Sequence, residues 1–214
     1  MQTLLANYAG IVLDRQHVLD ALLGEHNWGA DIDTGTITFE EPGLECPFEI
    51  VGSYAYAQKT WLWAWANQSL PEHMTGVSRK LLAYGQSHNV TKLTEERFPA
   101  QNEELHAFGV LACGIGGADA YYAADYGDGI LVAALTGDIV ASRWQPDHAR
   151  LLAVFPQVIR TFDLNHRAAL RSYCNALGYT VTGEDLLTAT RDGNTVTAAF
   201  DEQGRLADIT AHLR

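Results

Sequence analysis

The sequence predicts an α+β fold, in which an antiparallel sheet is built around a tryptophan-rich strand and covered by helices. The first observation is that Trp61, Trp63 and Trp65 alternate with smaller residues, as side chains alternate between the two faces of a strand. The second is that apolar residues recur at helical spacing before this stretch and again after it. The third is that strand-like segments bounded by turn residues lie on both sides of it.

The tryptophan strand, residues 61–65, is expected to pair with a second strand over residues 50–57 in a hairpin that turns at Gln58-Lys59. This register places Tyr56 opposite Trp61, Tyr54 opposite Trp63 and Gly52 opposite Trp65. The aromatic rings then gather on one face, where Gly52 leaves room beside Trp65, and small residues gather on the other. The alternative is a helix, which would bring Trp61 and Trp65 together and turn Trp63 away.

The N-terminal segment predicts a helix followed by a hairpin. Residues 3–25 have apolar positions at helical spacing, with Asp14, Arg15, Gln16 and Asp20 expected on the solvent side. Residues 28–41 predict a hairpin around Thr34-Gly35, and residues 40–47 predict a loop because they contain two prolines and a glycine. With the tryptophan hairpin, this makes a four-stranded antiparallel meander.

The middle of the chain predicts two helices and one more strand. A helix is expected over residues 78–88, and residues 93–99 are expected to be irregular or to form one short helix. A long helix capped by Asn102 is expected over residues 102–122, followed by a turn at 125–128. Residues 129–135 predict a strand that joins the same sheet.

The C-terminal segment predicts a smaller unit of helices and three antiparallel strands. Helices are expected over residues 147–162 and 163–177, and strands over 186–191, 195–200 and 205–213. Asp192-Gly193 is a strong hairpin turn. A boundary near 140–146 therefore divides the chain into residues 1–142 and 143–214. The alternatives are that both parts pack as one domain, or that the last strands extend the first sheet.

Composition argues against several classes of function. The formal net charge is −12, and the basic residues form no cluster, which argues against nucleic-acid binding and favours solubility or a basic partner. Cys46, Cys113 and Cys174 are an odd number and far apart, as in proteins of a reducing compartment. The longest uncharged apolar stretch is too short for a membrane span, and no secretory signal is evident, so a cytoplasmic protein is expected.

The motifs with possible metal or phosphate chemistry are incomplete. Asp31-x-Asp33-x-Gly35 lacks the remaining ligands of an EF-hand loop, and Glu103-x-x-His106 is a single copy of a motif that di-iron sites need twice. The glycine-rich stretch from Cys113 matches neither common phosphate-binding fingerprint. We therefore expect neither a metal nor a cofactor, and the sequence leaves open whether the protein is an enzyme.

The aromatic side chains of the tryptophan hairpin are the candidate ligand site. They could line a groove in which an amide supplies a polar anchor, since small-molecule sites combine aromatic walls with few polar groups. The alternative is that the same rings form the core beneath a helix. The candidate residues are Tyr54, Tyr56, Trp61, Trp63, Trp65 and Asn67.

The stretch Trp-Leu-Trp-Ala-Trp-Ala-Asn, at residues 61–67, resembles the signature of an uncharacterised, mainly bacterial family classified as a domain of unknown function. Asp31-Ile-Asp-Thr-Gly-Thr-Ile-Thr-Phe39 and the small-residue run from Gly114 to Tyr122 are also similar to it. The resemblance covers approximately residues 1–140 and does not extend to the last ~70. It implies no activity, cofactor or catalytic residue.

The leading hypothesis is a non-catalytic cytoplasmic module that binds another, basic protein, because the chain is acidic and shows no catalytic constellation. The rival is a small-molecule-binding protein or enzyme that uses the aromatic face, with Asp31 or Glu49 at its rim. A third hypothesis is a homodimer formed through the C-terminal strands.

Overall fold

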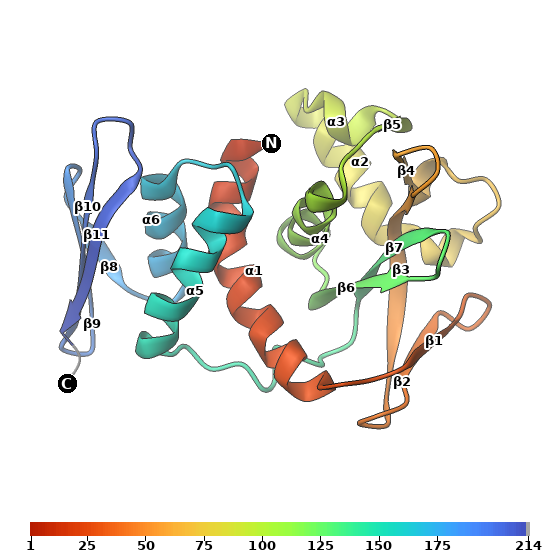
Figure 1. Cartoon of the computed structure of the whole chain (residues 1–214), viewed down its shortest axis with the longest axis horizontal. Helices are drawn as coiled ribbons and strands as arrows, with labels where there is room; N and C mark the ends of the chain where they lie inside the picture. The colour runs from red at the N-terminus through yellow and green to blue at the C-terminus, as the bar shows by residue number, and fades with distance from the viewer. Residues whose placement is uncertain (213–214) are drawn as a thin grey trace. The chain divides into compact units, whose positions relative to one another are not determined.

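The computed structural model, shown in Figure 1, describes residues 1–212 and confirms the α+β class. Its strands form two separate antiparallel sheets, so the alternative in which the last strands extend the first sheet is wrong. The chain divides into a large unit, Arg15–Trp144, and a small unit, Met1–Asp14 with Gln145–Arg214. Helix α1 (Gln2–Leu23) contributes its first part to the small unit and its remainder to the large unit.

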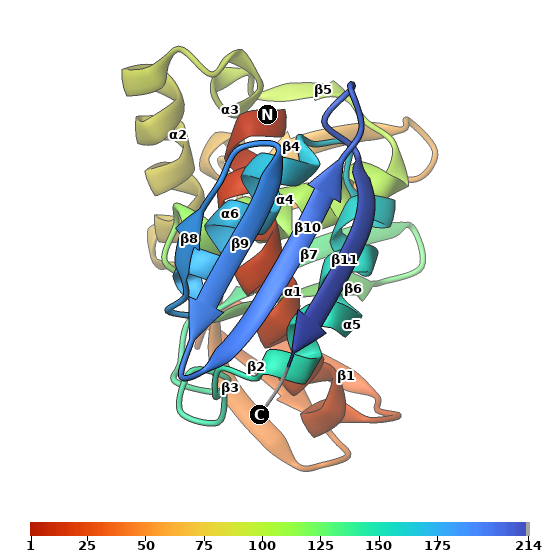
Figure 2. The ribbon, with the colours of Figure 1, turned by 90° about the vertical axis from the view of Figure 1, so that its left-hand side faces the viewer.

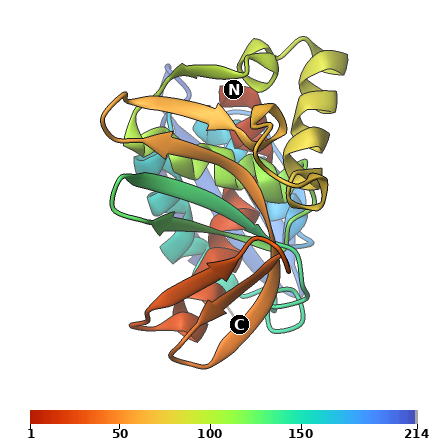
Figure 3. The ribbon, with the colours of Figure 1, turned by 90° about the vertical axis from the view of Figure 1, so that its right-hand side faces the viewer.

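The long strand β3 (Leu44–Ala55) is the centre of the sheet in the large unit (Figure 3). It pairs with β2, β4 and β7, and the predicted meander from β1 to β4 is confirmed. The other strands are β1 (Trp28–Asp31), β2 (Thr36–Phe39), β4 (Thr60–Trp63), β5 (Arg97–Pro99), β6 (Ala120–Asp125) and β7 (Gly129–Leu135). The strand predicted over 129–135 does join this sheet.

The register of the tryptophan hairpin differs from the prediction by two residues. Tyr54 lies opposite Trp61 and Gly52 opposite Trp63, because the loop has four residues, 56–59, instead of two. A two-residue hairpin turn favours Asn or Gly, and neither residue type stands at positions 58 and 59. In the four-residue loop, Lys59 takes the left-handed conformation, with a φ of 50°. A shift of two residues still leaves every side chain on its predicted face.

The end of the tryptophan strand is also corrected. Strand β4 ends at Trp63, and Trp65 lies in the short 3-10 helix η1 (Ala64–Ala66). Gly52 makes room for Trp61 rather than Trp65, because a Cβ atom there would lie 2.3 Å from Cζ2 of that ring. The same Cβ would lie 2.6 Å from the backbone oxygen of Leu62. The glycine is therefore required by the packing of the hairpin.

Helix α4 (Leu105–Gly114) packs on β6, β7 and β3, and its Phe108 reaches the tryptophan strand. The Phe108 ring centroid lies 4.5 Å from that of Trp61 and 5.1 Å from that of Trp63. Trp63 also donates its indole N–H to the backbone oxygen of Lys92, at 3.0 Å. The remaining helical elements of the unit are η2 (Glu72–Met74), α2 (Gly76–His88), α3 (Thr91–Thr94) and η3 (Asn102–Glu104).

The long helix predicted over 102–122 is wrong in its second half. Helix α4 ends at Gly114, and Gly117 then adopts a left-handed φ of 80° that stops the helix before β6 begins. The cap at the start is Gln101 rather than Asn102, and it forms a capping box with Glu104. Consecutive glycines therefore end this helix, where a continuous helical pattern is predicted.

Other boundaries differ less. The loop predicted over 40–47 ends at Gly43, and β3 continues through Pro47, whose missing N–H is tolerated where the pairing partner of β3 changes from β2 to β7. The region 93–99 contains the short helix expected as one alternative and also the unpredicted strand β5. The helices predicted over 3–25 and 78–88 are confirmed as α1 and α2.

The free edge of β6 is covered by a side chain of α1. Gln16 accepts a hydrogen bond from the backbone N–H of Tyr121, at 3.0 Å, and donates one to its carbonyl oxygen, at 2.9 Å. The amide thus occupies the position of a neighbouring strand. Gly109 on α4 leaves room for the Tyr121 ring, because a Cβ there would lie 2.3 Å from it.

The small unit places two helices against a four-stranded sheet of order β11-β10-β9-β8 (Figure 2). The two predicted helices are confirmed, although α6 is capped by Asn165 and begins later than the predicted residue 163. The three predicted strands are confirmed, and Leu213 lies outside the described residues. The elements are α5 (His148–Thr161), α6 (His166–Ala176), β8 (Thr180–Thr182), β9 (Leu186–Arg191), β10 (Asn194–Phe200) and β11 (Leu206–His212).

The hairpin turn predicted in the small unit is present in the structure. Asp192 and Gly193 both have left-handed φ, 53° and 77°, as the Asp-Gly turn predicts. Strand β8 was not predicted, because three residues are too few for a clear alternation.

Asp14 is buried, which corrects its predicted place on the solvent side of α1. Arg150 on α5 donates from Nε to its carboxylate, so the charge is paired inside the small unit. An isolated buried carboxylate would be too costly to retain, and the arginine makes the position tolerable. Helical periodicity alone does not reveal such a partner, because Arg150 is distant in sequence.

Candidate functional site

The two central residues of the predicted aromatic site are core residues. Trp61 and Trp63 are fully buried, with their ring centroids 5.3 Å apart. A fully buried ring offers no surface to a ligand. Tyr54, on the same strand face, is also buried.

The other three candidates lie around this core and are not gathered on one open face. Tyr56 is 37% exposed and donates its hydroxyl to Asp125, at 2.7 Å. Trp65 is partly exposed on η1, and the Asn67 side chain accepts a hydrogen bond from the backbone N–H of Ser69, at 3.1 Å. The structure therefore brings Tyr54 close to Tyr56 and Trp61 close to Trp63, with Tyr54 opposite Trp61 across the hairpin, whereas Trp65 and Asn67 lie beyond the end of β4.

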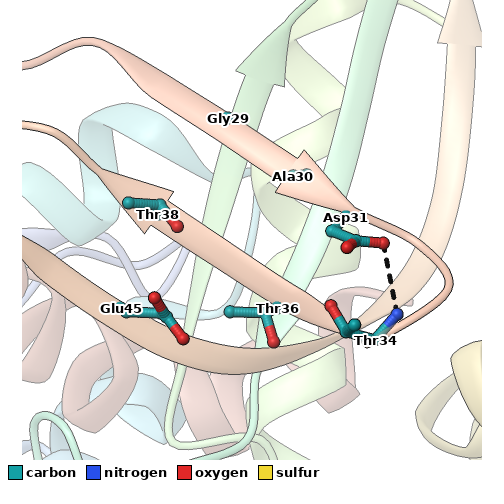
Figure 4. Close-up of a pocket in the computed structure, with 7 residues that line it drawn as sticks. All are labelled: Gly29, Ala30, Asp31, Thr34, Thr36, Thr38 and Glu45. Atoms are coloured by element: carbon teal, nitrogen blue, oxygen red, sulfur yellow. Dashed lines mark hydrogen bonds between the residues drawn. The ribbon is translucent and has the colours of Figure 1, made fainter.

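A concave surface lies elsewhere in the large unit, on the outer face of β1, β2 and the start of β3 (Figure 4). Its volume is about 360 Å³, and we call it the hairpin site. Its residues are polar or small: Gly29, Ala30, Asp31, Thr34, Thr36, Thr38 and Glu45.

The strand register explains why these side chains share one face. Directly opposite residues of an antiparallel pair lie on the same side of the sheet. One row therefore runs from Gly29 through Thr38 to Glu45, and the next from Asp31 to Thr36. The opposite face of the same strands carries apolar residues of the core, Ile37, Phe39 and Cys46 among them. Burial of that face holds the polar face toward solvent.

The two ends of the hairpin site are carboxylates. Asp31 accepts hydrogen bonds from the backbone N–H groups of Asp33 and Thr34, at 2.9 and 3.2 Å. These donors, the Thr34 N–H above all, lower the pKa of Asp31, so its carboxylate is ionised at neutral pH. Glu45 is exposed at the other end, on β3.

The segment that carries the hairpin site has charges of one sign. Residues 16–58 contain eight acidic residues and neither lysine nor arginine. Besides Asp31 and Glu45, the exposed acids of the hairpin itself are Asp33, Glu40 and Glu41. This surface therefore attracts cations and repels anions.

A comparison with protein-family models matches residues 2–138 to a family of unknown function, DUF6882. The chain belongs to this family. The resemblance to a domain-of-unknown-function family over about residues 1–140 is thus confirmed. Neither the curated proteins nor the solved structures gave a match. The hairpin site lies within the DUF6882 match, whereas strands β8 to β11 lie outside it.

A second polar group in the DUF6882 region joins α1, α4 and β6. His106 Nδ1 lies 3.0 Å from the Tyr121 hydroxyl, and Asp20 and His17 are close enough to act on one another electrostatically. Partial burial lowers the pKa of His106 and raises that of Asp20. Burial also raises the pKa of Tyr121, so its hydroxyl remains protonated. These groups position α4 on the sheet.

The three cysteines are free and do not have the properties of nucleophiles. Burial raises the pKa of Cys46 to about 11 and that of Cys174 to about 12, and it also raises the pKa of Cys113. A thiol with a raised pKa is a weak nucleophile, because the thiolate is the reactive form.

Residues 1–212 contain no group of three or more His, Cys, Asp or Glu side chains placed to hold a metal ion. Among the helices in that part of the chain, none combines the length and the apolar character that crossing a bilayer requires.

Glu45 is the residue of the hairpin site that sequence reasoning misses. The loop predicted over 40–47 hides its place on β3, beside Thr38. Asp31 is named from the sequence as an acid at the rim of the aromatic face, and the sequence does not reveal its neighbours in the hairpin site. The signal that could have found the site is the absence of lysine and arginine from residues 16–58.

Proposed function

We propose that the large unit is a non-catalytic binding module whose hairpin site binds an extended, basic segment of another protein. The observation that carries this proposal is a concave, threonine-lined surface with carboxylates at both ends, in a part of the chain without lysine or arginine. Opposite charge steers such a partner to the surface and fixes its orientation. The three free cysteines favour a reducing compartment, the cytoplasm, as the place where this happens.

The geometry suggests the spacing of the basic residues in the partner. Asp31 and Glu45 lie two strands apart, and they are offset by two residues along the strands, because Asp31 is in line with Pro47. Strand spacings of about 4.8 Å and a rise of about 3.3 Å per residue put their Cα atoms about 12 Å apart. An extended peptide covers this distance in three or four residues. We therefore expect a partner with lysine or arginine at that spacing, and threonine hydroxyls that bond to its backbone.

The open edge of β1 offers a further means of recognition. Strand β1 is at the end of the strand order and has four residues, most of them exposed. An extended segment lying beside it could form main-chain hydrogen bonds while its basic side chains reach the hairpin site. This mode needs no change in the fold.

The test is fluorescence anisotropy with a labelled peptide that contains two lysine pairs four residues apart, measured in low salt and at 0.5 M NaCl. The double variant Asp31→Asn/Glu45→Gln should weaken binding at least about tenfold, that is, by about 1.4 kcal/mol. Asparagine keeps the oxygen that accepts the turn N–H groups, so the hairpin should stay folded. Added salt should weaken binding of the original protein, because exposed charges are screened.

The matched control is Glu95→Gln/Glu96→Gln, which removes two exposed carboxylates from another part of the large unit. We expect less than a twofold change for this control. If both double variants weaken binding equally, the peptide responds to total charge and the hairpin site is not the binding site. Equal binding of a glutamate peptide of the same length would also refute the proposal.

A further inference from the structure

Strand β11 (Leu206–His212) is an open edge of the sheet in the small unit. Its one neighbour is β10, so the backbone groups on its other side have no partner strand. Natural edge strands are usually protected by lysine, proline or a bulge. In β11 the protection is confined to its beginning, where the pairing shifts around Ala207. The stretch from Asp208 to His212 is regular and contains neither lysine nor proline.

The face of β11 that turns toward the helices is apolar and incompletely covered. Ile209 lies opposite Ala198, and Ala211 lies opposite Val196. Ala198 and Val196 are buried, whereas Ile209 and Ala211 are partly exposed. The apolar layer of the small unit therefore ends abruptly at β11. One more strand beyond this edge would extend the layer and remove apolar surface from water.

The occupant that fits this edge is a second copy of the same strand. If two copies of the regular stretch pair antiparallel about Thr210, Asp208 of each copy lies opposite His212 of the other. Ile209 then lies opposite Ala211, so the apolar face is continued, and the two Thr210 side chains meet at the two-fold axis. Cross-strand pairs of this kind, acid with histidine and apolar with apolar, are favourable. The strand is thus complementary to itself, as a two-fold interface requires.

The distribution of charge permits self-association at this edge. The small unit contains nine acidic residues and seven arginines, whereas the large unit contains seventeen acidic and seven basic residues. The large unit therefore carries most of the net negative charge, and the small unit is close to neutral. Repulsion between two copies is accordingly weakest where the small units meet.

We propose that the protein forms a homodimer in which two β11 strands pair antiparallel about Thr210 and join two four-stranded sheets into one sheet of eight. This surface is separate from the hairpin site and does not rest on the function proposed for it. It belongs to the part of the chain that the DUF6882 match does not cover.

Sedimentation velocity on the full chain, at about 1–100 μM, tests the proposal. The original protein should sediment as a dimer at the upper end of this range. Thr210→Lys should raise the dissociation constant of the dimer at least about tenfold, because it places two ammonium groups opposite each other at the two-fold axis. Thr210 is exposed on the outer face of the sheet, so the substitution should leave the fold intact, which circular dichroism checks.

The matched control is Thr190→Lys, at an exposed position on the outer face of β9, an internal strand of the same sheet. It should dimerise like the original protein. A monomer at 100 μM in the original protein overturns the proposal. A dimer that survives Thr210→Lys overturns it too, because the contact then lies on another surface, and equal weakening by both variants would show an effect of charge alone.

Discussion

The most direct test of the packing in the small unit is the substitution Arg150→Met. Asp14 is fully buried, and the arginine side chain that pairs with it is 24% exposed. Methionine has a similar length and can fill the space of the arginine stem, but it cannot neutralise the carboxylate. The variant therefore leaves the buried carboxylate without its arginine, and it also removes the exposed contacts of Arg150 with the Gln145 carbonyl oxygen and with Asp147.

The expected loss follows from this burial. Removing one partner of a buried ion pair destabilises a protein by about 3–5 kcal/mol, because the remaining charge stays out of water. With a urea dependence of about 1–2 kcal/mol per M for a unit of this size, the midpoint should fall by about 1.5–5 M. The free energy of unfolding of a native protein is usually about 5–15 kcal/mol. A loss of this size should therefore leave the small unit of the variant only marginally folded.

Urea unfolding followed by two signals measures this. All five tryptophans lie in the large unit, so their emission reports that unit alone. Far-UV circular dichroism reports both units, and the early transition of the variant should appear in it. Arg160→Met, at an exposed position in the last turn of the same helix, is the control and should change stability by less than about 1 kcal/mol.

A loss below about 1 kcal/mol in Arg150→Met would refute the reasoning, since Asp14 would then reach water or be protonated without penalty. The double variant Asp14→Leu/Arg150→Met provides a second test. It removes both charges and should recover most of the stability, because apolar replacement of a buried pair is often neutral or favourable. A double variant as unstable as the single one would show that packing, and not the charge, causes the loss.

Three further predictions concern the large unit, and urea unfolding followed by tryptophan emission measures each. Gly52→Ala should destabilise the large unit by about 3 kcal/mol, because the added Cβ meets a backbone oxygen that cannot move aside. The control Gly29→Ala, with open space around it, should be neutral. Equal effects of the two substitutions would contradict the packing described. Asp119→Ala should lower the free energy of unfolding by about 2–3 kcal/mol, because the carboxylate accepts hydrogen bonds from the three backbone N–H groups of residues 139–141. An unchanged urea midpoint would contradict this prediction. Because the pKa of His106 is lowered in the folded state, the unfolded chain binds more protons just below pH 6.5, and stability falls as the pH drops through that range. His106→Gln should reduce this pH dependence, and an identical slope in both proteins would disprove it.

Strong local signals predicted much of the fold. The Asp192-Gly193 turn and the periodicity of α1 depend on residues close in sequence, and both are confirmed. The register of the tryptophan hairpin could not be predicted, because it depends on a four-residue loop whose length has no sequence signature here. The end of α4 was missed because Gly116-Gly117 is compatible both with a closely packed helix and with a helix stop, and tertiary contacts decide between them.

The candidate site was harder to predict for the same reason. Whether Trp61 and Trp63 line a groove or fill a core depends on Phe108, which reaches them from a helix distant in sequence. The hairpin site depends on which residues of β1, β2 and β3 share a face, and the register decides that. The acidic character of Asp31 and its exposure are readable from sequence, but its position across the sheet from Glu45 is not.

The division of helix α1 between two units has a consequence for how the chain is made. Residues up to Asp14 belong to the small unit, whose next segment begins at Gln145, so the whole of residues 15–144 must leave the ribosome between them. At about 5–20 residues per second, this interval lasts roughly 7–26 s. The N-terminal half of the helix, with its apolar face, is exposed during that time unless a chaperone or a temporary contact covers it. The large unit has all its own residues earlier and is free to fold first, while the small unit must wait until its last strand, β11, has been made.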